Sequence, residues 1–206
     1  MVSRLLAALL LALAGGAQAD APARFDYYLL ALSWSPQHCA GKAAKADPQC
    51  RRPLGFVVHG LWPQNERGWP QYCGQAGWLP EPLIERMLPI MPSRKLILHQ
   101  WKKHGVCSGL DAPAYFATVE RAYRAIRIPA RYHAPGDYLR VSPAMLEADF
   151  RTANPALRPD GIALECSGNY LREVRICLDR TLQPRRCGVD LVDRCGAQTT
   201  LRPSRH

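Results

Sequence analysis

Beyond its first 19 residues, the chain lacks any apolar run of the roughly 20 residues that a membrane-spanning helix needs. The apolar run within them, Leu5 to Ala14, follows the cationic Arg4 and precedes the small-residue triplet Ala17-Gln18-Ala19. That order is typical of a secretory signal peptide. We therefore expect a signal peptide over 1–19, a mature chain from Asp20 without a membrane span, and a periplasmic or secreted protein.

The chain also lacks two common zinc-binding spacings, Cys-x-x-Cys and His-Glu-x-x-His. We therefore expect no metal and no cofactor. An even number of cysteines on a chain predicted to be exported indicates a disulfide framework. The number alone leaves the pairing open among the eight cysteines, which are Cys39, Cys50, Cys73, Cys107, Cys166, Cys177, Cys187 and Cys195.

No internal repeat and no Gly/Ser-rich linker divides residues 20–206, and their length suits a single domain with its own core. Lysine is scarce, because 22 of the 27 cationic residues are arginine; the net charge of +10 becomes +9 once Arg4 is removed with the signal peptide. The planar fork of arginine donates bidentately to phosphate, so the charge favours a polyanion such as nucleic acid as partner. On charge alone, a basic protein without such a partner remains the alternative.

Hydrophobic periodicity predicts two buried strands, then four helices, then a two-stranded hairpin, over 25–35, 54–61, 80–90, 94–104, 112–126, 142–153 and 162–179 in that order. Residues 36–53 and 64–78 are predicted loops. Pro63 is expected to stop the second strand, Ser93 to cap the helix at 94–104, and Gly105 to end it. Strands that bracket the helices indicate an α+β fold, with a central antiparallel sheet packed with several helices and stabilised by disulfides.

The segment HQWKKHGVC, residues 99–107, concentrates titratable and cationic side chains. On a helix that turns about 100° per residue, His99, Lys103, Gln100 and His104 fall at about 0°, 40°, 100° and 140°. All four can share one face, with Gln100 and His104 one turn apart. The angle between the two histidines suits a shared metal poorly.

Two imidazoles can act as base and acid near neutral pH, and a lysine beside them can stabilise added negative charge. Metal-free cleavage of RNA needs that set: a base takes the ribose 2′-OH proton, a cation stabilises the phosphorane, and an acid protonates the departing 5′-oxygen. Base and acid must stand on opposite sides of the phosphorus, which one helix face does not easily provide. His59, at the end of an apolar strand in FVVHGLWP, is the candidate from a second element.

FVVHGLWP and HQWKKHGVC resemble the two active-site segments of the T2-type ribonuclease family, and ALSWSP with Cys39 resembles the first strand of its bacterial members. The resemblance runs over most of residues 25–195. It implies an endoribonuclease that cleaves single-stranded RNA with low base specificity through a 2′,3′-cyclic phosphate. It also implies His104 as general base, His59 as general acid, Lys103 as the stabiliser of the phosphorane, and His99 as a phosphate contact.

The same resemblance implies that Trp62 and Tyr72 stack a base, while Gln64 and Asn65 contact base edges. The other four tryptophans, Trp34, Trp69, Trp78 and Trp101, are interpreted as packing groups. The family further implies the disulfides Cys73–Cys107, Cys166–Cys195 and Cys177–Cys187, with Cys39–Cys50 assigned by proximity. We expect a monomer.

Gln100 is a departure, because the family usually has glutamate at this position. Glutamine keeps the size and the hydrogen-bonding capacity but carries no charge. We therefore expect a pH optimum lower than that of a Gln100→Glu variant, since a carboxylate raises the pKa of a nearby imidazolium. The departure also leaves open an alternative function: a catalytically weakened or inactive module that binds RNA or another polyanion.

Overall fold

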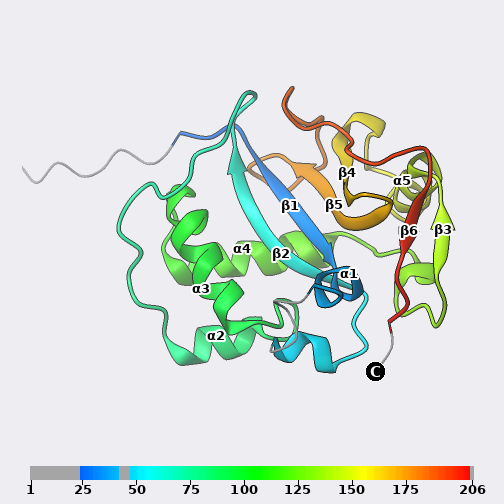
Figure 1. The fold of residues 1–206 in the computed structure, drawn as a ribbon. Coiled ribbons are helices and arrows are strands. Elements are labelled where there is room, and N and C mark those ends of the chain that lie inside the picture. The colour runs from blue at the N-terminus through cyan, green and yellow to red at the C-terminus, as the bar shows by residue number, and fades with distance from the viewer. Residues whose placement is uncertain (1–23, 42–46, 205–206) are drawn as a thin grey trace, which may run out of the picture.

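The computed structural model describes residues 24–41 and 47–204, so the predicted signal peptide at 1–19 lies outside the described residues. One sheet contains the strands β1 Tyr27–Trp34, β2 Phe56–Gln64, β3 Leu139–Val141, β4 Ile162–Ser167, β5 Tyr170–Leu178 and β6 Thr199–Leu201 (Figure 1). Their order is β2-β1-β5-β6-β3, and β4 also pairs with β5. Each of these pairings is antiparallel except a parallel contact between β5 and β6, so the predicted α+β fold is confirmed.

The helices are α1 Ser35–Cys39, α2 Glu81–Met87, α3 Arg94–Lys103, α4 Ala112–Ala125 and α5 Pro143–Ala153. Figure 1 shows α2, α3 and α4 gathered on the β2 side of the molecule, with α5 beside β3 and β6 at the other end. Two short helices, α1 and a 3-10 turn at Pro48–Arg51, lie in the segment predicted as a loop, and a proline stands in the first turn of each. Within the part of the chain described, no helix is long and apolar enough to span a membrane.

Strand β1 is buried on both faces of the sheet. Its successive side chains point alternately to the two faces. Tyr28, Leu30 and Leu32 belong to the main hydrophobic core, where helix α4 also buries aromatic side chains. Tyr27 and Leu29 point to the other face, where they form a smaller apolar cluster with Trp62 packed against it. This second face becomes the floor of the candidate site.

The prediction that Pro63 stops the second strand is wrong. Strand β2 continues through Trp62 and Pro63 to Gln64, and Pro63 pairs in register with Tyr28. Strand β2 lies at the edge of the sheet, where a missing backbone N–H can be tolerated. The longer strand carries Trp62 and Gln64 to the same face as Tyr27 and Leu29.

The helix predicted at 94–104 forms, but its two ends differ from the expectation. Ser93 occupies the N-cap position without a side-chain capping hydrogen bond, and His104 has already left helical geometry at φ −120°. Gly105 does not cap the helix in a left-handed conformation. A Cβ atom there would lie 2.3 Å from the Trp101 ring, so Gly105 permits close packing of the chain against that ring.

Four disulfides staple the fold: Cys39–Cys50, Cys73–Cys107, Cys166–Cys195 and Cys177–Cys187. The last three are the pairs that the family resemblance implied, and Cys39–Cys50 is the pair assigned by proximity. Cys73–Cys107 joins the long 65–79 loop to the turn that follows α3. Cys166–Cys195 joins β4 to the C-terminal segment.

We predict that removing Cys73–Cys107 costs more stability than removing Cys177–Cys187, because the first disulfide spans 34 residues and the second only 10. In the chain-entropy account, double replacement by serine lowers the free energy of unfolding by about 4 kcal/mol for the first pair and about 3 kcal/mol for the second. Urea unfolding of the two double variants measures both values. An equal loss, or the reverse order, would contradict the prediction.

Candidate active site

A cleft of about 310 Å³ lies on the face of the sheet away from the main core. Most of the predicted site residues line it, although they come from β2, from α3 and from the chain just beyond each element. These residues are His59, Trp62, Gln64, Asn65, His99, Gln100, Lys103 and His104. The two sequence segments predicted to face each other therefore do meet in one cavity.

His59 reaches the cleft through a β-bulge. Ala31 of β1 pairs with Gly60, and Leu32 pairs with Val58, so His59 is an extra residue opposite no partner on β1. A bulge bends the strand locally and redirects a side chain, and bulges are frequent beside active sites. Here the bulge allows His59 to face the cleft while Val58 stays in the core.

The ring of His59 is held from behind by a buried carboxylate. Its Nδ1 lies 2.5 Å from Oε1 of Glu173, whose side chain is 4% exposed against 32% for His59. Burial alone would raise the pKa of Glu173. The hydrogen bond from His59 and the charges of His59 and Arg175 outweigh burial and lower that pKa to about 2. Glu173 is therefore ionised and acts as the acceptor, so Nδ1 of His59 carries a proton.

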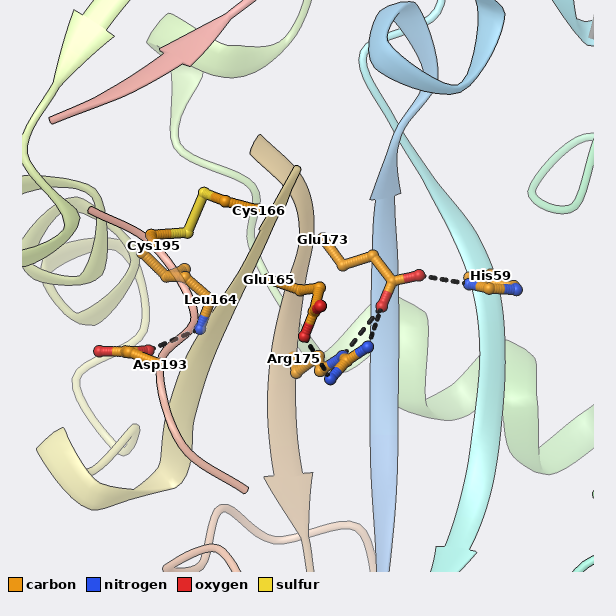
Figure 2. A network of polar contacts seen from close by, with 8 residues as sticks. All are labelled: His59, Leu164, Glu165, Cys166, Glu173, Arg175, Asp193 and Cys195. Carbon is orange, nitrogen blue, oxygen red and sulfur yellow. Dashed lines mark hydrogen bonds and ion pairs between the residues drawn. A yellow bond between two sulfur atoms is a disulfide. The ribbon is translucent and has the colours of Figure 1, made fainter. Parts of the chain in front are cut away.

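Glu173 is itself clamped by Arg175, two residues along the same strand. Nε of Arg175 donates to Oε2 of Glu173 at 2.9 Å, and Nη1 forms an ion pair with Glu165 at 3.0 Å. Figure 2 shows Arg175 between the two carboxylates, with the Glu173 side chain passing over β1 toward His59. The contacts form a continuous chain from Glu165 on β4 to His59 on β2.

Gln100 is fixed by the neighbouring tryptophan rather than free in the cleft. It is 1% exposed, and its Oε1 accepts a hydrogen bond from Nε1 of Trp62 at 2.7 Å. Gly60 makes this contact possible, because a Cβ at that position would lie 2.2 Å from Oε1 of Gln100 and 2.4 Å from Nε1 of Trp62. The His-Gly-Leu-Trp pattern thus has a steric reason for its glycine.

His104 occupies the most enclosed position of the three site histidines. It is buried, and its ring stacks on Trp62 with centroids 5.1 Å apart. Desolvation lowers the pKa of His104, and the charges of Lys103, His59 and His99 lower it further, to about 3. Its Nδ1 is buried without a hydrogen-bond partner among the described residues. The ring is therefore neutral at physiological pH.

His99 and Lys103 lie at the more open side of the cleft. Burial first, and then the charge of Lys103, lower the pKa of His99. The positive end of Lys103 lies close enough to His99 and His104 for its charge to lower the pKa of both. An anionic group entering the cleft would meet this cationic edge.

The aromatic side chains only partly follow the predictions. Trp34 and Trp101 are buried, as expected of packing groups, whereas Trp69 and Trp78 are 53% and 81% exposed. Trp69 lines the cleft, and the interpretation of it as a packing group is wrong. Tyr72 is exposed and is not among the residues that line this cleft; its backbone N–H donates to Lys103 at 2.8 Å. The structure therefore brings Trp69, rather than Tyr72, into the cleft beside Trp62.

Glu165, Glu173 and Arg175, which form the chain of contacts behind His59, were not predicted from the sequence. Nor were Asp190 and Arg194, which also line the cleft. Glu173 and Arg175 alternate in EVRICL, a strand that is otherwise largely apolar and has neighbours on both sides. Charged side chains at alternate positions of a central strand are costly unless they are paired. The alternating charges in this strand could have indicated paired residues, but they do not reveal that Glu173 pairs with His59.

A second cavity of about 300 Å³ lies on the other side of His59 and Glu173. Its polar lining comes largely from α1, from the Cys39–Cys50 loop and from the start of β5, and includes Ser33, Gln37, His38, Gln49 and Arg172. His38 pairs with Asp47 at 3.3 Å at its border. His59 thus lines both of the adjoining cavities, whereas Glu173 lines only the second.

The fold is that of known ribonuclease-like proteins. The RNase-related protein from Calystegia sepium superposes with a TM-score of 0.69 at 22% identity, over 88% of this chain and 99% of that chain. A ribonuclease of Aeromonas hydrophila is 39% identical over 160 residues, which are 76% of this chain and 73% of that protein. A probable ribonuclease of Haemophilus influenzae is 35% identical over 184 residues, covering 82% of this chain and 63% of that protein.

Fold and similarity together define the class of protein as an endoribonuclease of the T2 type. Residues 25–187 match the ribonuclease T2 family, and the chain belongs to that family. The resemblance inferred from its two histidine-containing segments is therefore confirmed.

We predict that Gly60→Ala disrupts the site. The added methyl group cannot coexist with the hydrogen bond between Trp62 and Gln100. Overpacking of this kind lowers the free energy of unfolding by roughly 1–3 kcal/mol, and RNA cleavage falls with it. Urea unfolding and a cleavage assay measure both effects. Gly136→Ala is the matched control, because nothing lies within 4 Å of a Cβ there; equal effects of the two substitutions would refute the steric argument.

Proposed function

We propose that the protein is an exported endoribonuclease that cleaves single-stranded RNA with low base specificity by metal-free transphosphorylation. The observation that supports this most directly is the contrast between two imidazoles in one cleft. His104 is buried, neutral and stacked on Trp62, whereas His59 donates to a buried carboxylate. One imidazole kept neutral by burial and one held against an ionised carboxylate suit the separate roles of base and acid.

In the proposed reaction, the neutral ring of His104 takes the proton from the ribose 2′-OH. The 2′-oxygen then bonds to phosphorus, and the bond between phosphorus and the 5′-oxygen breaks. His59 gives a proton from Nε2 to the departing 5′-oxygen, which leaves a 2′,3′-cyclic phosphate on one product and a 5′-OH on the other. Because the two histidines come from different elements, they can approach the phosphorus from different sides.

Lys103 and His99 are proposed to stabilise the phosphoryl oxygens. Developing negative charge in a partly desolvated cleft is stabilised more strongly than in water. Gln100 would orient Trp62, since its side-chain oxygen is already engaged by the indole N–H. Having glutamine instead of the family's usual glutamate at position 100 therefore leaves both proton-transferring groups, His59 and His104, in place.

We propose that Trp62, Gln64, Asn65 and Trp69, which all line the cleft, contact the bases of the RNA. Tyr72 does not line the cleft, so we propose that it contacts RNA outside it. Aromatic stacking tolerates any base, so it agrees with low base specificity. The two cavities that adjoin at His59 offer space for the nucleosides on both sides of the scissile phosphate.

Export is proposed because four disulfides persist best in an oxidising compartment such as the periplasm or the cell exterior. A signal peptide at 1–19 would precede a single ribonuclease domain at 20–206, which we propose acts as a monomer.

The reaction is tested by incubating the oxidised mature protein with RNA in excess EDTA. We expect RNA fragments that end in 2′,3′-cyclic phosphate, and a rate roughly 10²–10⁴-fold lower for His59→Ala, because general acid catalysis contributes about that much. Mass spectrometry of the product ends reads out the mechanism. Tightly bound but uncut RNA would contradict the proposal and favour the inactive binding module instead.

The role of Gln100 is tested by Gln100→Glu. A carboxylate one turn from His104 raises the pKa of that imidazole above its value of about 3. The base must be neutral, so activity is lost as the pH falls through the pKa of His104. The acidic limb of the pH–rate profile therefore moves to higher pH in Gln100→Glu, and the wild-type optimum is the lower one. Coincident acidic limbs in matched profiles would reject this role.

A further inference from the structure

We infer that Glu173 is a positioning residue for His59: held by Arg175, it fixes the tautomer and the orientation of the imidazole, so that Nε2 is the nitrogen that gives a proton to the departing 5′-oxygen. The inference rests on the proposed role of His59 as general acid. It adds to the reaction a residue that does not touch the substrate but acts through one that does.

The sheet is built so that Glu173 can reach His59 across an intervening strand. Glu173 on β5 pairs with Ser33 of β1, and Ser33 in turn pairs with Val57 of β2. Strands two apart are separated by roughly 9–10 Å, which a glutamate and an imidazole can bridge together only over a small residue. Ser33 is that residue at this level, and Figure 2 shows the bridge passing over β1.

The bulge at His59 completes the contact. In a regular strand, His59 and Leu61 would point to the same face of the sheet, so they could not lie one in the cleft and the other in the core. With the bulge, Leu61 remains in the core and the Nδ1 atom of His59 meets Oε1 of Glu173 at 2.5 Å. The other ring nitrogen, Nε2, is the one left to carry the proton that is transferred.

The charges of the network favour a protonated His59. Glu165 and Glu173 supply two negative charges, and Arg175 neutralises one of them. A proton on His59 balances the second negative charge, so Glu165, Glu173, Arg175 and His59 together carry no net charge only when His59 is protonated. Further charged groups line the two cavities beside His59. Lys103, Arg172 and Arg194 oppose its proton, whereas the carboxylates Asp47 and Asp190 favour it. Any proton on His38, His99 or His104 also opposes it.

The test compares two substrates that differ in their need for an acid. One is a dinucleoside monophosphate, whose 5′-oxygen must be protonated on departure. The other is a nucleoside 3′-(4-nitrophenyl phosphate), whose leaving group departs readily as an anion. The measurement is kcat/KM against pH in EDTA for wild type, Glu173→Gln, Arg175→Gln and His59→Ala, with folding checked by circular dichroism.

We expect Glu173→Gln to lose roughly 10- to 100-fold on the dinucleoside monophosphate, which is the range for removing the carboxylate that orients a metal-binding histidine, and little on the nitrophenyl ester. Its alkaline limb moves to lower pH, because the imidazolium loses the negative charge beside it. Arg175→Gln moves the same limb to higher pH, because the cluster then carries an extra negative charge. That opposite shift provides a second test should Glu173→Gln fail to fold.

Glu120→Gln is the matched control, since Glu120 pairs with Arg86 on the helices away from the cleft and its loss leaves activity unchanged. Equal losses of Glu173→Gln on both substrates, or an alkaline limb that coincides with that of wild type, overturn the inference. If wild type cleaves neither substrate, the proposed function itself fails. If His59→Ala loses equally on both substrates, the assignment of the acid fails, and the inference is overturned with it.

Discussion

Strand β2 must satisfy two demands that a regular strand cannot meet together. Val58 and Leu61 are both buried in the core although they are three residues apart, and period-two alternation would place them on opposite faces. The extra residue that resolves this conflict is His59. The geometry of the site follows from that bulge: it sets the direction of the imidazole, the position of Gly60 beneath Gln100, and the approach of Trp62 to His104.

The two histidines differ in what surrounds each imidazole: an apolar cover for His104 and an ionised carboxylate for His59. His104 follows directly after α3 and is covered by Trp62, so burial keeps its ring neutral. His59 stands over a sheet face that carries a clamped carboxylate. An enzyme that uses one imidazole to accept a proton and another to donate one near neutral pH needs this difference. Two imidazoles in identical surroundings would have the same protonation state.

The sequence was informative wherever a local pattern determines the local structure. Hydrophobic periodicity led to the long strands and helices, and two short motifs led to the family. Prediction failed where the outcome depends on distant neighbours. Pro63 stays in a strand because β2 is at an edge, and Gly105 is required by the ring of Trp101 rather than by a helix cap.

The same limit explains why Glu173 was missed while His99 and Lys103 were found. Residues on one helix face share a period that can be read directly along the chain. The partner of His59 is 114 positions away and is separated from it by a whole strand, so no spacing connects the two. Only the sheet order β2-β1-β5, together with a small residue at Ser33, brings them into contact. A charged residue alternating within a central strand is therefore a reason to search the neighbouring strands for its partner, and in this protein that search leads back to the active site.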